Sequence, residues 1–298
     1  MARVRSIKFA ICGLLQALCI QQAFLLQGCE GAIRGSVSVE EEDDFADRFT
    51  SFGDVNTKFD KHRAVPYFFM VPKTGTTTLR THMRKCFHLV SSYEIGDFTT
   101  GQSRKADVFM SALPLRVNSE FSSNLPLRMF TFFRDPMERV VSKFFYLQVA
   151  EWERKAYNPA LKDWSLRNYV ESDLHVDNFV TRQLVGKYNP QVELTENDLL
   201  HAKQLLTRKC LIGLTSRYQD SLLRFQQYFG WDIRDDPQCG PNSEDKMNAN
   251  KHRNSDEFGM GLQRELARIE KWDILLYEHA LYLFEEQGKI LQQIKQIK

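Results

Sequence analysis

The sequence carries almost no excess of charge of one sign. Its 40 lysine and arginine residues stand against 38 aspartate and glutamate residues, which leaves a formal net charge of +2. A protein whose main function is to grip a long nucleic acid needs a clear basic excess, so this balance excludes that class and we expect no nucleic-acid partner. Any anion-binding site must therefore be local.

Several common metal and nucleotide motifs are absent as well. The six cysteines include no CxxC pair and no Cys/His cluster with metal-ligand spacing, so we expect no metal site. No Gly-x-x-x-x-Gly-Lys-Ser/Thr motif occurs, which argues against hydrolysis of ATP or GTP. The composition, 43% hydrophobic and 26% charged, is that of a globular protein and excludes disordered, collagenous and multi-pass membrane chains.

One long uncharged run is present, and it lies near the N-terminus. Phe9 to Cys29 contain no charged residue and follow Arg3, Arg5 and Lys8. Basic residues before an apolar run are typical of secretory insertion, so residues 1–29 are predicted to be a signal anchor or a cleaved signal peptide. A helix of this length, at about 1.5 Å per residue, could cross a hydrocarbon core of about 30 Å. The alternative is a buried helix of the folded domain.

The cysteines bear on the same question of compartment. Cys12 and Cys19 lie within the apolar run. Four others would face an oxidising lumen if the chain is secreted: Cys29, Cys86, Cys210 and Cys239. They allow one or two disulfides with three complete pairings, and the spacing favours none of these.

The rest of the chain is predicted to be a linker and one domain. Residues 30–63 contain an acidic run and scattered glycine and serine, a composition that cannot bury a core, and are predicted to form a stem. Residues 64–298 are predicted to form the domain. Its four strands, buried on both faces, are expected at Tyr67–Val71, Asp107–Ala112, Met129–Phe133 and Cys210–Leu214.

Helical patterns alternate with these runs. They are predicted at Thr77–Phe87, Pro136–Lys155, Trp164–Leu184, Glu196–Thr207, Ser221–Phe229 and from Gly261 to the end, with a polar loop at Asp235–Phe258. Short apolar strands that alternate with helices are typical of an α/β fold with a parallel sheet flanked by helices.

The clearest functional signal follows the first predicted strand. The segment Val71-Pro-Lys-Thr-Gly-Thr-Thr-Thr-Leu79 opens a helix, whose N-terminus offers unpaired N–H groups and the positive end of its dipole. Gly75 lets the backbone approach an anion, and the Lys73 ammonium with the hydroxyls of four threonines completes a cage for phosphate or sulfate oxygens. These threonines are Thr74, Thr76, Thr77 and Thr78. The alternative is a threonine-capped helix after a turn.

A second signal follows the third predicted strand. Asp135 is predicted to cap the next helix, with Pro136 at its first position, which places Arg134 where the strand ends. Ligands bind at such strand ends in open α/β sheets, so Arg134 and Ser142 could hold a second phosphate. Arg139 shares a helix face with Ser142, and a solvated or salt-bridged surface arginine is the alternative for it.

These two segments resemble motifs of the sulfotransferases that use 3′-phosphoadenosine 5′-phosphosulfate (PAPS). The similarity is to the Golgi carbohydrate type, closest to the heparan sulfate and uronyl 2-O-sulfotransferases, and extends from about Ala64 to Phe284. Supporting stretches are 178–186, 211–215 and 272–280. The resemblance implies a P-loop-like α/β sulfotransferase domain, PAPS as co-substrate without a metal, a carbohydrate acceptor, and a Golgi membrane layout with a lumenal catalytic domain.

The resemblance also implies roles for individual residues. Lys73 and the loop Thr74 to Thr78 would hold the 5′-phosphosulfate, while Arg134 and Ser142 would hold the 3′-phosphate. Lys73 would be catalytic, because it can stabilise the charge that grows on the departing phosphate. A general base should take the proton of the acceptor hydroxyl.

The chain departs from the enzymes that it resembles at that base. They place a histidine where this sequence has Ala112, which leaves the base unassigned. His82 and Glu94 are candidates, although His82 adjoins the apolar stripe of its helix and fits a packed histidine better. His88 is predicted to lie in a strand after that helix. Sulfation of tyrosine or of a small metabolite, and a catalytically silent PAPS- or glycan-binding protein, are the alternative functions.

Two further sets of residues have open roles. Arg182 is predicted either to face an acidic sugar or the cofactor, or to form an ordinary ion pair on a helix surface. Four residues lie where the family has a mobile loop over the cofactor, with a solvated loop as the alternative: Lys246, Asn248, Asn250 and Lys251.

Overall fold

The computed structural model describes residues 44–99, 105–121, 126–154, 156–233, 239 and 258–296. The predicted targeting segment, residues 1–29, and nearly all of the polar segment 235–258 lie outside the described residues. Of the helices in the described part, none combines the length and the apolar character needed to cross a membrane.

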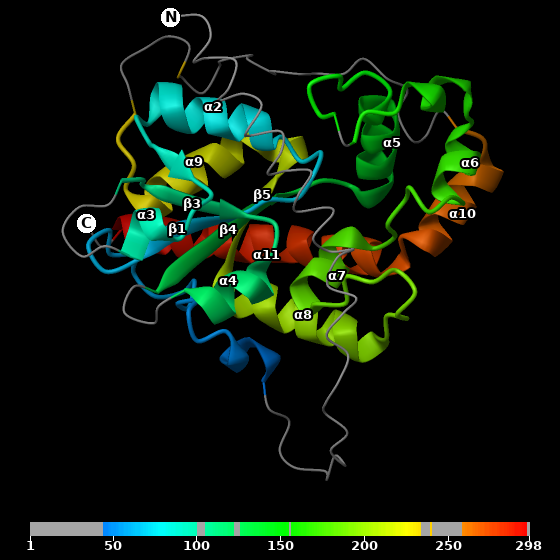
Figure 1. Ribbon diagram of the computed structural model, residues 1–298. Helices are drawn as coiled ribbons and strands as arrows, with labels where there is room; N and C mark the ends of the chain where they lie inside the picture. The colour runs from blue at the N-terminus through cyan, green and yellow to red at the C-terminus, as the bar shows by residue number, and fades with distance from the viewer. Residues whose placement is uncertain are drawn as a thin grey trace, which may run out of the picture.

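A single sheet of five parallel strands forms the centre of the fold (Figure 1). In chain order the strands are β1 (Val65–Phe69), β2 (Ser91–Ser92), β3 (Val108–Ser111), β4 (Leu127–Phe133) and β5 (Cys210–Leu214). Their order across the sheet is β2-β3-β1-β4-β5, and every neighbouring pair is parallel. The predicted α/β fold with a parallel sheet flanked by helices is confirmed. The strand predicted through His88 is displaced, because the edge strand β2 begins only at Ser91.

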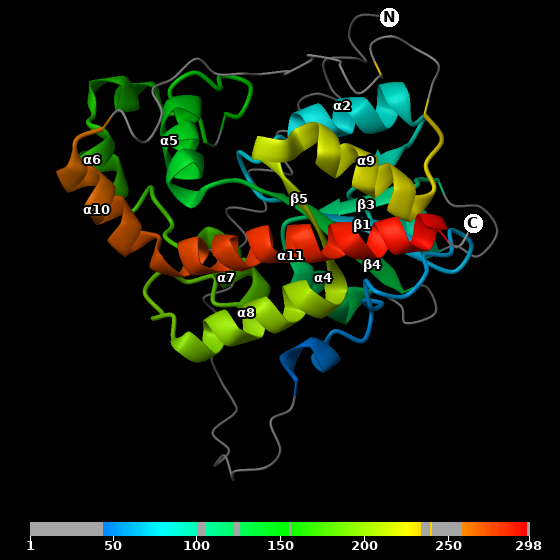
Figure 2. The ribbon, with the colours of Figure 1, turned by 180° about the vertical axis from the view of Figure 1, so that it is seen from behind.

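Successive side chains of the strands point into two apolar layers. On β1, Tyr67 and Phe69 point to one face while Phe68 points to the other. Helices α2 (Thr76–Cys86) and α9 (Tyr218–Phe229) cover the Phe68 face. The opposite face is covered by α4 (Pro114–Glu120), α7 (Phe179–Val185), α8 (Glu196–Lys209) and α11 (Lys271–Gln296) (Figures 1 and 2). Because both faces are covered, the strands are continuous apolar runs.

Helix α9 approaches strand β5 closely at Gly213. A Cβ atom at this glycine would lie 2.6 Å from Cζ of Phe225 and 3.1 Å from Cβ of Ser221. The Ser221 hydroxyl also accepts a hydrogen bond from the Leu214 amide at 2.9 Å, which fixes the helix to the end of the strand. The absence of a side chain at position 213 is therefore a packing requirement.

A third apolar cluster lies at the carboxyl end of the sheet. It joins α5 (Pro136–Leu147), α6 (Leu166–Val170) and α10 (Met260–Ile269), which gather together in both ribbon views (Figures 1 and 2). Because α5 directly follows β4, this group of helices stands beside the strand ends that carry the predicted anion-binding residues.

Three predicted helices differ from the observed ones. The helix predicted over Pro136–Lys155 ends with α5, after which the chain continues in tight turns. The helix predicted over Trp164–Leu184 is divided into α6 and α7, because Asn178 between them has a left-handed φ of 46°. The helix predicted from Gly261 onward is divided into α10 and α11 at Glu270, whose side chain is turned into the interior.

The folded domain begins earlier than predicted. The stem prediction for residues 30–63 is wrong for its second half. A short 3-10 helix at Phe45–Arg48 contacts α8 and packs into the apolar layer on that face of the sheet. Phe49 and Phe52 are almost completely buried in the same layer. Phenylalanines at this spacing fall on one side of a helical turn. The stem prediction missed this pattern because it was based on the acidic overall composition of the segment.

Cys86 and Cys239 form a disulfide, which is one of the pairings left open by the sequence. It ties the last residue of α2 to a residue 153 positions later in the chain. Cys210 is a free thiol buried in β5, where burial raises its pKa. Cys29 lies outside the described residues.

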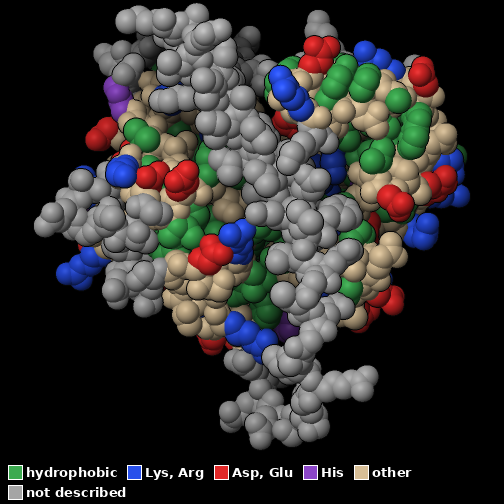
Figure 3. Space-filling view, in the orientation of Figure 1, with side chains coloured by type: hydrophobic (Ala, Val, Ile, Leu, Met, Phe, Trp, Pro, Cys, Tyr) green, Lys and Arg blue, Asp and Glu red, His purple; other side chains and the backbone are tan. Residues whose placement is uncertain are grey.

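On the face seen in Figure 3, described lysine and arginine side chains are interspersed with aspartate and glutamate side chains. The near-neutral balance of the whole sequence is thus repeated locally on this surface. A local arrangement of a few side chains, rather than the general field of the protein, must then select an anion.

Candidate functional site

The two predicted anion-binding motifs lie at neighbouring strand ends. The segment 70–75 follows β1, Arg134 follows β4, and β1 pairs directly with β4. The chain places β2 and β3 on one side of β1 and then crosses to place β4 and β5 on the other. Ligands of open α/β sheets bind outside the carboxyl ends of the strands at such a switch in direction. The fold therefore brings both motifs to the position where this architecture binds ligands.

The loop between β1 and α2 is shaped by two left-handed residues and two threonines. Lys73 has a φ of 68° and Gly75, the N-cap of α2, has a φ of 82°. The hydroxyl of Thr74 donates to the Val71 carbonyl at 2.8 Å, and that of Thr76 donates to the same carbonyl at 3.4 Å. These bonds close the loop upon itself, and Gly75 allows the turn into the helix without a steric penalty.

Two of the four predicted cage hydroxyls are turned toward the loop itself. The hydroxyl protons of Thr74 and Thr76 are committed to the loop backbone, so these threonines shape the loop instead of donating to an anion. Thr77 is exposed and Thr78 is half-buried in the first turn of α2. The N–H groups of that turn, the exposed Thr77 hydroxyl and the Lys73 ammonium are donors that the loop presents.

Lys73 is the charged group of the loop. Its Nζ lies 3.6 Å from the centroid of the Tyr146 ring on α5, a cation–π contact. The pKa of Lys73 is lowered to about 8, chiefly by burial; the Glu153 carboxylate opposes this effect and Arg134 adds to it. An amine in this environment titrates near neutral pH, which is typical of functional sites.

Arg134 reaches the same loop from the neighbouring strand. Its Nη1 donates to the Lys73 carbonyl at 3.4 Å, and its Nη2 pairs with Glu138 at 3.2 Å. The predicted cap of α5 is confirmed, because the Asp135 carboxylate accepts the Glu138 amide at 3.0 Å. The structure thus brings Lys73 and Arg134 together, and about a quarter of the Arg134 side chain stays exposed.

Ser142 lies farther along α5. Its side chain is buried, and its hydroxyl has no hydrogen-bond partner among the described residues. Tyr146, which contacts Lys73, follows Ser142 by four residues on the helix. Residues at this spacing lie on the same side of a helix about 5–6 Å apart, so Ser142 is on the side of α5 that faces the Lys73 loop.

Arg139 is not a surface arginine. Its Nη2 lies 3.2 Å from Glu270 and 3.3 Å from Asp273, and all three side chains are buried. The Asp273 carboxylate also accepts the amides of Val180 and Thr181, at 3.0 and 2.8 Å, and so caps the start of α7. Burial raises the pKa of Asp273, while Arg139 acts in the opposite direction. The supporting stretches 178–186 and 272–280 are therefore joined through a buried polar network.

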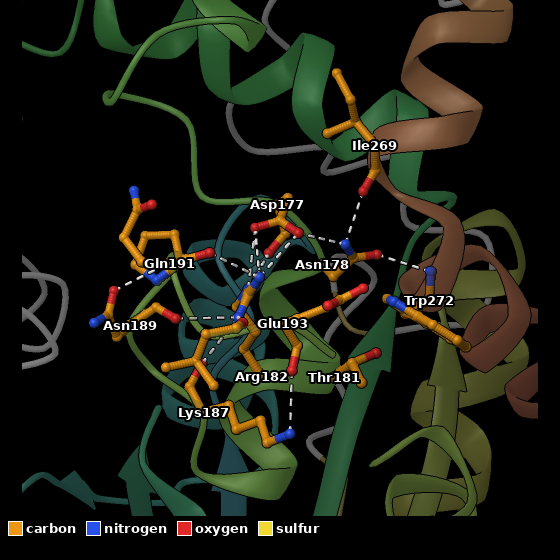
Figure 4. Close-up of polar contacts among 12 residues, drawn as sticks. Asp177, Asn178, Thr181, Arg182, Lys187, Asn189, Gln191, Glu193, Ile269 and Trp272 are labelled. Atoms are coloured by element: carbon orange, nitrogen blue, oxygen red, sulfur yellow. Dashed lines mark hydrogen bonds and ion pairs between the residues drawn. The ribbon is translucent and has the colours of Figure 1, made fainter. Parts of the chain in front are cut away.

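Arg182 is also structural (Figure 4). The predicted ion pair is present, but it is buried and not on a helix surface. The side chain is buried, with its Nη2 2.9 Å from the Asp177 carboxylate. The guanidinium further donates to the backbone carbonyls of Lys187, Asn189, Pro190 and Val192. With the Asp177 backbone carbonyl, which accepts from Nε at 3.1 Å, six acceptor groups occupy the donors of this arginine. It therefore organises the loop after α7 and has no free group for an acidic sugar.

Asn178, next to Asp177, bridges the junction of the last two helices (Figure 4). Its side-chain amide donates to the Ile269 carbonyl at 2.7 Å, and its side-chain oxygen accepts the Trp272 amide at 2.8 Å. One side chain thus satisfies backbone groups at the end of α10 and at the start of α11.

The residues considered as a general base are dispersed. His82 is buried with Nδ1 3.3 Å from the Thr78 carbonyl oxygen, which agrees with the packed-histidine interpretation. Glu94 is exposed after β2. The strand prediction for His88 is wrong, because this residue has a φ of 56° in the turn before β2. Ala112 is buried just past the end of β3.

Four predicted loop residues lie outside the described residues: Lys246, Asn248, Asn250 and Lys251. Within the described residues, no group of three or more His, Cys, Asp or Glu side chains is placed to hold a metal ion. A comparison with protein-family models found no match to the chain, and a comparison with curated proteins found no match to its sequence.

Tyr146 and Glu153 complete the surroundings of Lys73 and were not predicted. The Tyr146 hydroxyl donates to the Glu153 carboxylate at 2.6 Å. The spacing of Tyr146 from Ser142 is a signal in the sequence for the first of them, since both fall on one helix face. Glu153 has no such signal, because it lies in the turns after α5 and its position depends on how the chain folds back.

Proposed function

We propose that the chain is a PAPS-dependent sulfotransferase that transfers the sulfuryl group to a hydroxyl of a carbohydrate. The observation that carries this proposal is the meeting of Lys73 and Arg134 at adjacent carboxyl ends of a parallel sheet. Lys73 lies just before the N-terminus of α2, and Arg134 lies just before the capped N-terminus of α5. Two cationic groups at these positions suit a ligand with two separate anionic groups. A 3′,5′-bisphosphorylated nucleoside has that character.

In this proposal the β1–α2 segment acts as a P-loop-like phosphosulfate loop. The first N–H groups of α2 and the Lys73 ammonium bind the 5′-phosphosulfate, while Arg134 and Ser142 bind the 3′-phosphate. PAPS supplies an activated sulfuryl group. The acceptor hydroxyl oxygen bonds to sulfur, the sulfur–oxygen bond to the 5′-phosphate breaks, and its electron pair stays on the phosphate oxygen.

Lys73 has the central chemical role. Its ammonium stabilises the charge that grows on the departing phosphate oxygen, an interaction that strengthens in the transition state. Arg134 and Ser142 hold the far phosphate before and after transfer alike, so they contribute to binding. The hydroxyl proton leaves to a base other than residue 112, which is alanine in this chain.

The compartment proposed is the Golgi lumen, with residues 1–29 as anchor or signal. The Cys86–Cys239 disulfide supports this proposal, because disulfides form and persist in the oxidising secretory pathway.

A second candidate function is a silent binder of PAPS or of a glycan. The observation that favours it is Ala112, a buried methyl group at the end of β3 where the resembling enzymes have a histidine. Such a protein would keep the nucleotide site and transfer no sulfate.

The decisive experiment is transfer of labelled sulfate from PAPS to a panel of polysaccharides, peptides containing tyrosine, and phenolic metabolites. The full chain is produced in a secretory pathway and compared with its Lys73→Ala variant. Labelled polysaccharide with the parent alone supports the proposal, and labelled peptide or phenol would reassign the acceptor. Nucleotide binding without transfer would indicate the silent binder, and a chain that neither binds nor transfers would refute both.

A further inference from the structure

The ammonium group of Lys73 rests on an aromatic ring. Its Nζ lies 3.6 Å from the centroid of the Tyr146 ring, closer than most cation–π pairs require. The backbone of Lys73 has a φ of 68°, a conformation that costs energy for a residue with a Cβ atom and persists only when its surroundings demand it. The loop therefore holds this lysine in an unusual conformation whose amine ends on α5.

The Tyr146 ring is fixed at its far end. The hydroxyl donates to Oε1 of Glu153 at 2.6 Å and accepts the indole N–H of Trp152 at 3.2 Å. A short hydrogen bond to an ionised carboxylate is stronger than one between neutral groups. Burial raises the pKa of Tyr146, and the bond to Glu153 acts in the same direction, so the phenol stays protonated and keeps donating.

Glu153 is in turn held by its backbone. Its amide donates to the Ala150 carbonyl, and its own carbonyl accepts the amides of Ala156 and Tyr157, each at 2.8 Å. The side chain is buried, yet no lysine or arginine among the described residues lies within ion-pair distance of it. Buried carboxylates are rare unless paired. Among the described residues, this carboxylate acts on the Lys73 ammonium, which lies over the face of the Tyr146 ring whose hydroxyl Glu153 accepts.

We propose that Tyr146 and Glu153 are positioning residues for Lys73: the ring fixes the place of the ammonium, and the carboxylate keeps it charged. This proposal rests on the proposed function only for the role of Lys73 toward the departing phosphate. Its geometry, from Glu153 through Tyr146 to Lys73, stands independently of the reaction.

The charged groups that act on Lys73 come from three segments. Glu153, from the turns after α5, favours the ammonium, whereas Arg134, from the end of β4, disfavours it. Burial in the loop also disfavours the charge, and the balance leaves the pKa at about 8. Because this value lies near working pH, removal of either neighbour changes the fraction of Lys73 that is charged. The pair Glu153 and Arg134 therefore sets the pH range in which the lysine can act.

The test measures Lys73 directly on the full chain. Trace acylation by acetic anhydride at a series of pH values, read by peptide mass spectrometry, gives the midpoint at which the Lys73 amine becomes reactive. Exposed lysines in the same sample serve as the internal reference. The midpoint should be near 8 in the parent, lower in Glu153→Gln and higher in Arg134→Ala.

The matched control is Glu151→Gln, which removes the same charge from an exposed residue two positions away and should leave the midpoint unchanged. Tyr146→Leu, which removes the ring, should lower the midpoint, and Tyr146→Phe should retain more of the parental value. An unchanged or raised midpoint in Glu153→Gln overturns the proposal, and so does a midpoint in Tyr146→Leu equal to that of the parent.

A second arm separates this inference from the proposed function. Where sulfate transfer is observed, Glu153→Gln should lose about tenfold in kcat/KM above the midpoint for every pH unit by which the midpoint falls, and little below it. A merely structural defect would lower the rate by the same factor at every pH, which would contradict the proposal. If the parent transfers nothing, the proposed function fails, while the acylation midpoints still decide the role of Tyr146 and Glu153.

Discussion

Nη2 of Arg139 lies 3.3 Å from the Asp273 carboxylate, although the two residues are 134 positions apart in the chain. The contact joins α5 to α11 inside the protein, and Asp273 extends it to α7 through the Thr181 amide and hydroxyl, both at 2.8 Å. The helices beside the candidate site are therefore held to the sheet layer by charged groups as well as by apolar packing.

Arg139→Ala should lower the free energy of unfolding by about 3–5 kcal/mol, because it leaves Glu270 and Asp273 buried without their cation. Urea denaturation followed by circular dichroism measures the change. Arg167→Ala is the control, since its guanidinium pairs with carboxylates at a half-exposed position and its loss should cost at most about 1 kcal/mol. Equal losses in the two variants would contradict the network.

Gly213→Ala should destabilise the protein by about 1–3 kcal/mol, because the new methyl group would overlap the Phe225 ring. Thermal unfolding of the variant tests this expectation. Gly259→Ala has open space around the added methyl, so its cost should be confined to the weaker N-cap of α10 and be smaller than that of Gly213→Ala. The double variant with Phe225→Leu should recover part of the loss, and no recovery would place the strain elsewhere.

Binding of 3′-phosphoadenosine 5′-phosphate should be much tighter than binding of ADP, because only the former offers a 3′-phosphate to Arg134 and Ser142. Loss of one charge-assisted contact costs about 1.5–3 kcal/mol, so Arg134→Ala should weaken binding at least about tenfold. Calorimetry with both nucleotides decides the matter. Arg116→Ala removes an arginine with the same spacing to its glutamate partner and should leave binding unchanged.

Lys73→Ala should reduce turnover by about 100- to 1000-fold while desulfated nucleotide still binds appreciably, since the lysine acts where charge develops during transfer. Single-turnover assays at saturating PAPS measure the effect. A variant that turns over within about threefold of the parent and binds nucleotide more weakly would make Lys73 an anchor only, contrary to the transition-state role.

The pH dependence of transfer should reflect the charge of Lys73. Its pKa is lowered to about 8, and the reactive form is the ammonium, so kcat/KM for PAPS should be full below this pH and fall as pH rises through it. The fall of kcat should occur at a higher pH than the fall of kcat/KM, because the negative charge of bound nucleotide raises the pKa of Lys73. A kcat/KM that stays level well above pH 8 would exclude this role.

The strands could be predicted because burial on both faces leaves a mark in the sequence. β5 was predicted over the same residues, Cys210–Leu214, and the cap of α5 at Asp135 followed from local chemistry alone. The position of β2 could not be predicted: a strand was expected through His88, but Ser91 and Ser92, which have no apolar side chain, pair instead because β3 lies beside them.

The breaks in the helices depend on contacts across long sequence separations. The division at Asn178 and the junction after Ile269 are joined by a hydrogen bond between these two residues, which lie 91 positions apart. Local helix propensity does not depend on such contacts, so the sequence predicted one long helix in each of these two regions. The role of Glu153 could not be predicted for the same reason. This residue comes near Lys73 only because α5 packs beside the loop in the folded protein.

The Cys86–Cys239 bond has a consequence for the continuity of the chain. It closes a covalent ring that contains β2, β3, β4 and β5, while β1 lies outside it. A protease that cuts once anywhere between residues 87 and 238 therefore produces two pieces that remain linked until a reductant is added. The last strand of the sheet cannot drift away from the first after such a nick, and Cys239 must leave the ribosome before this protection exists.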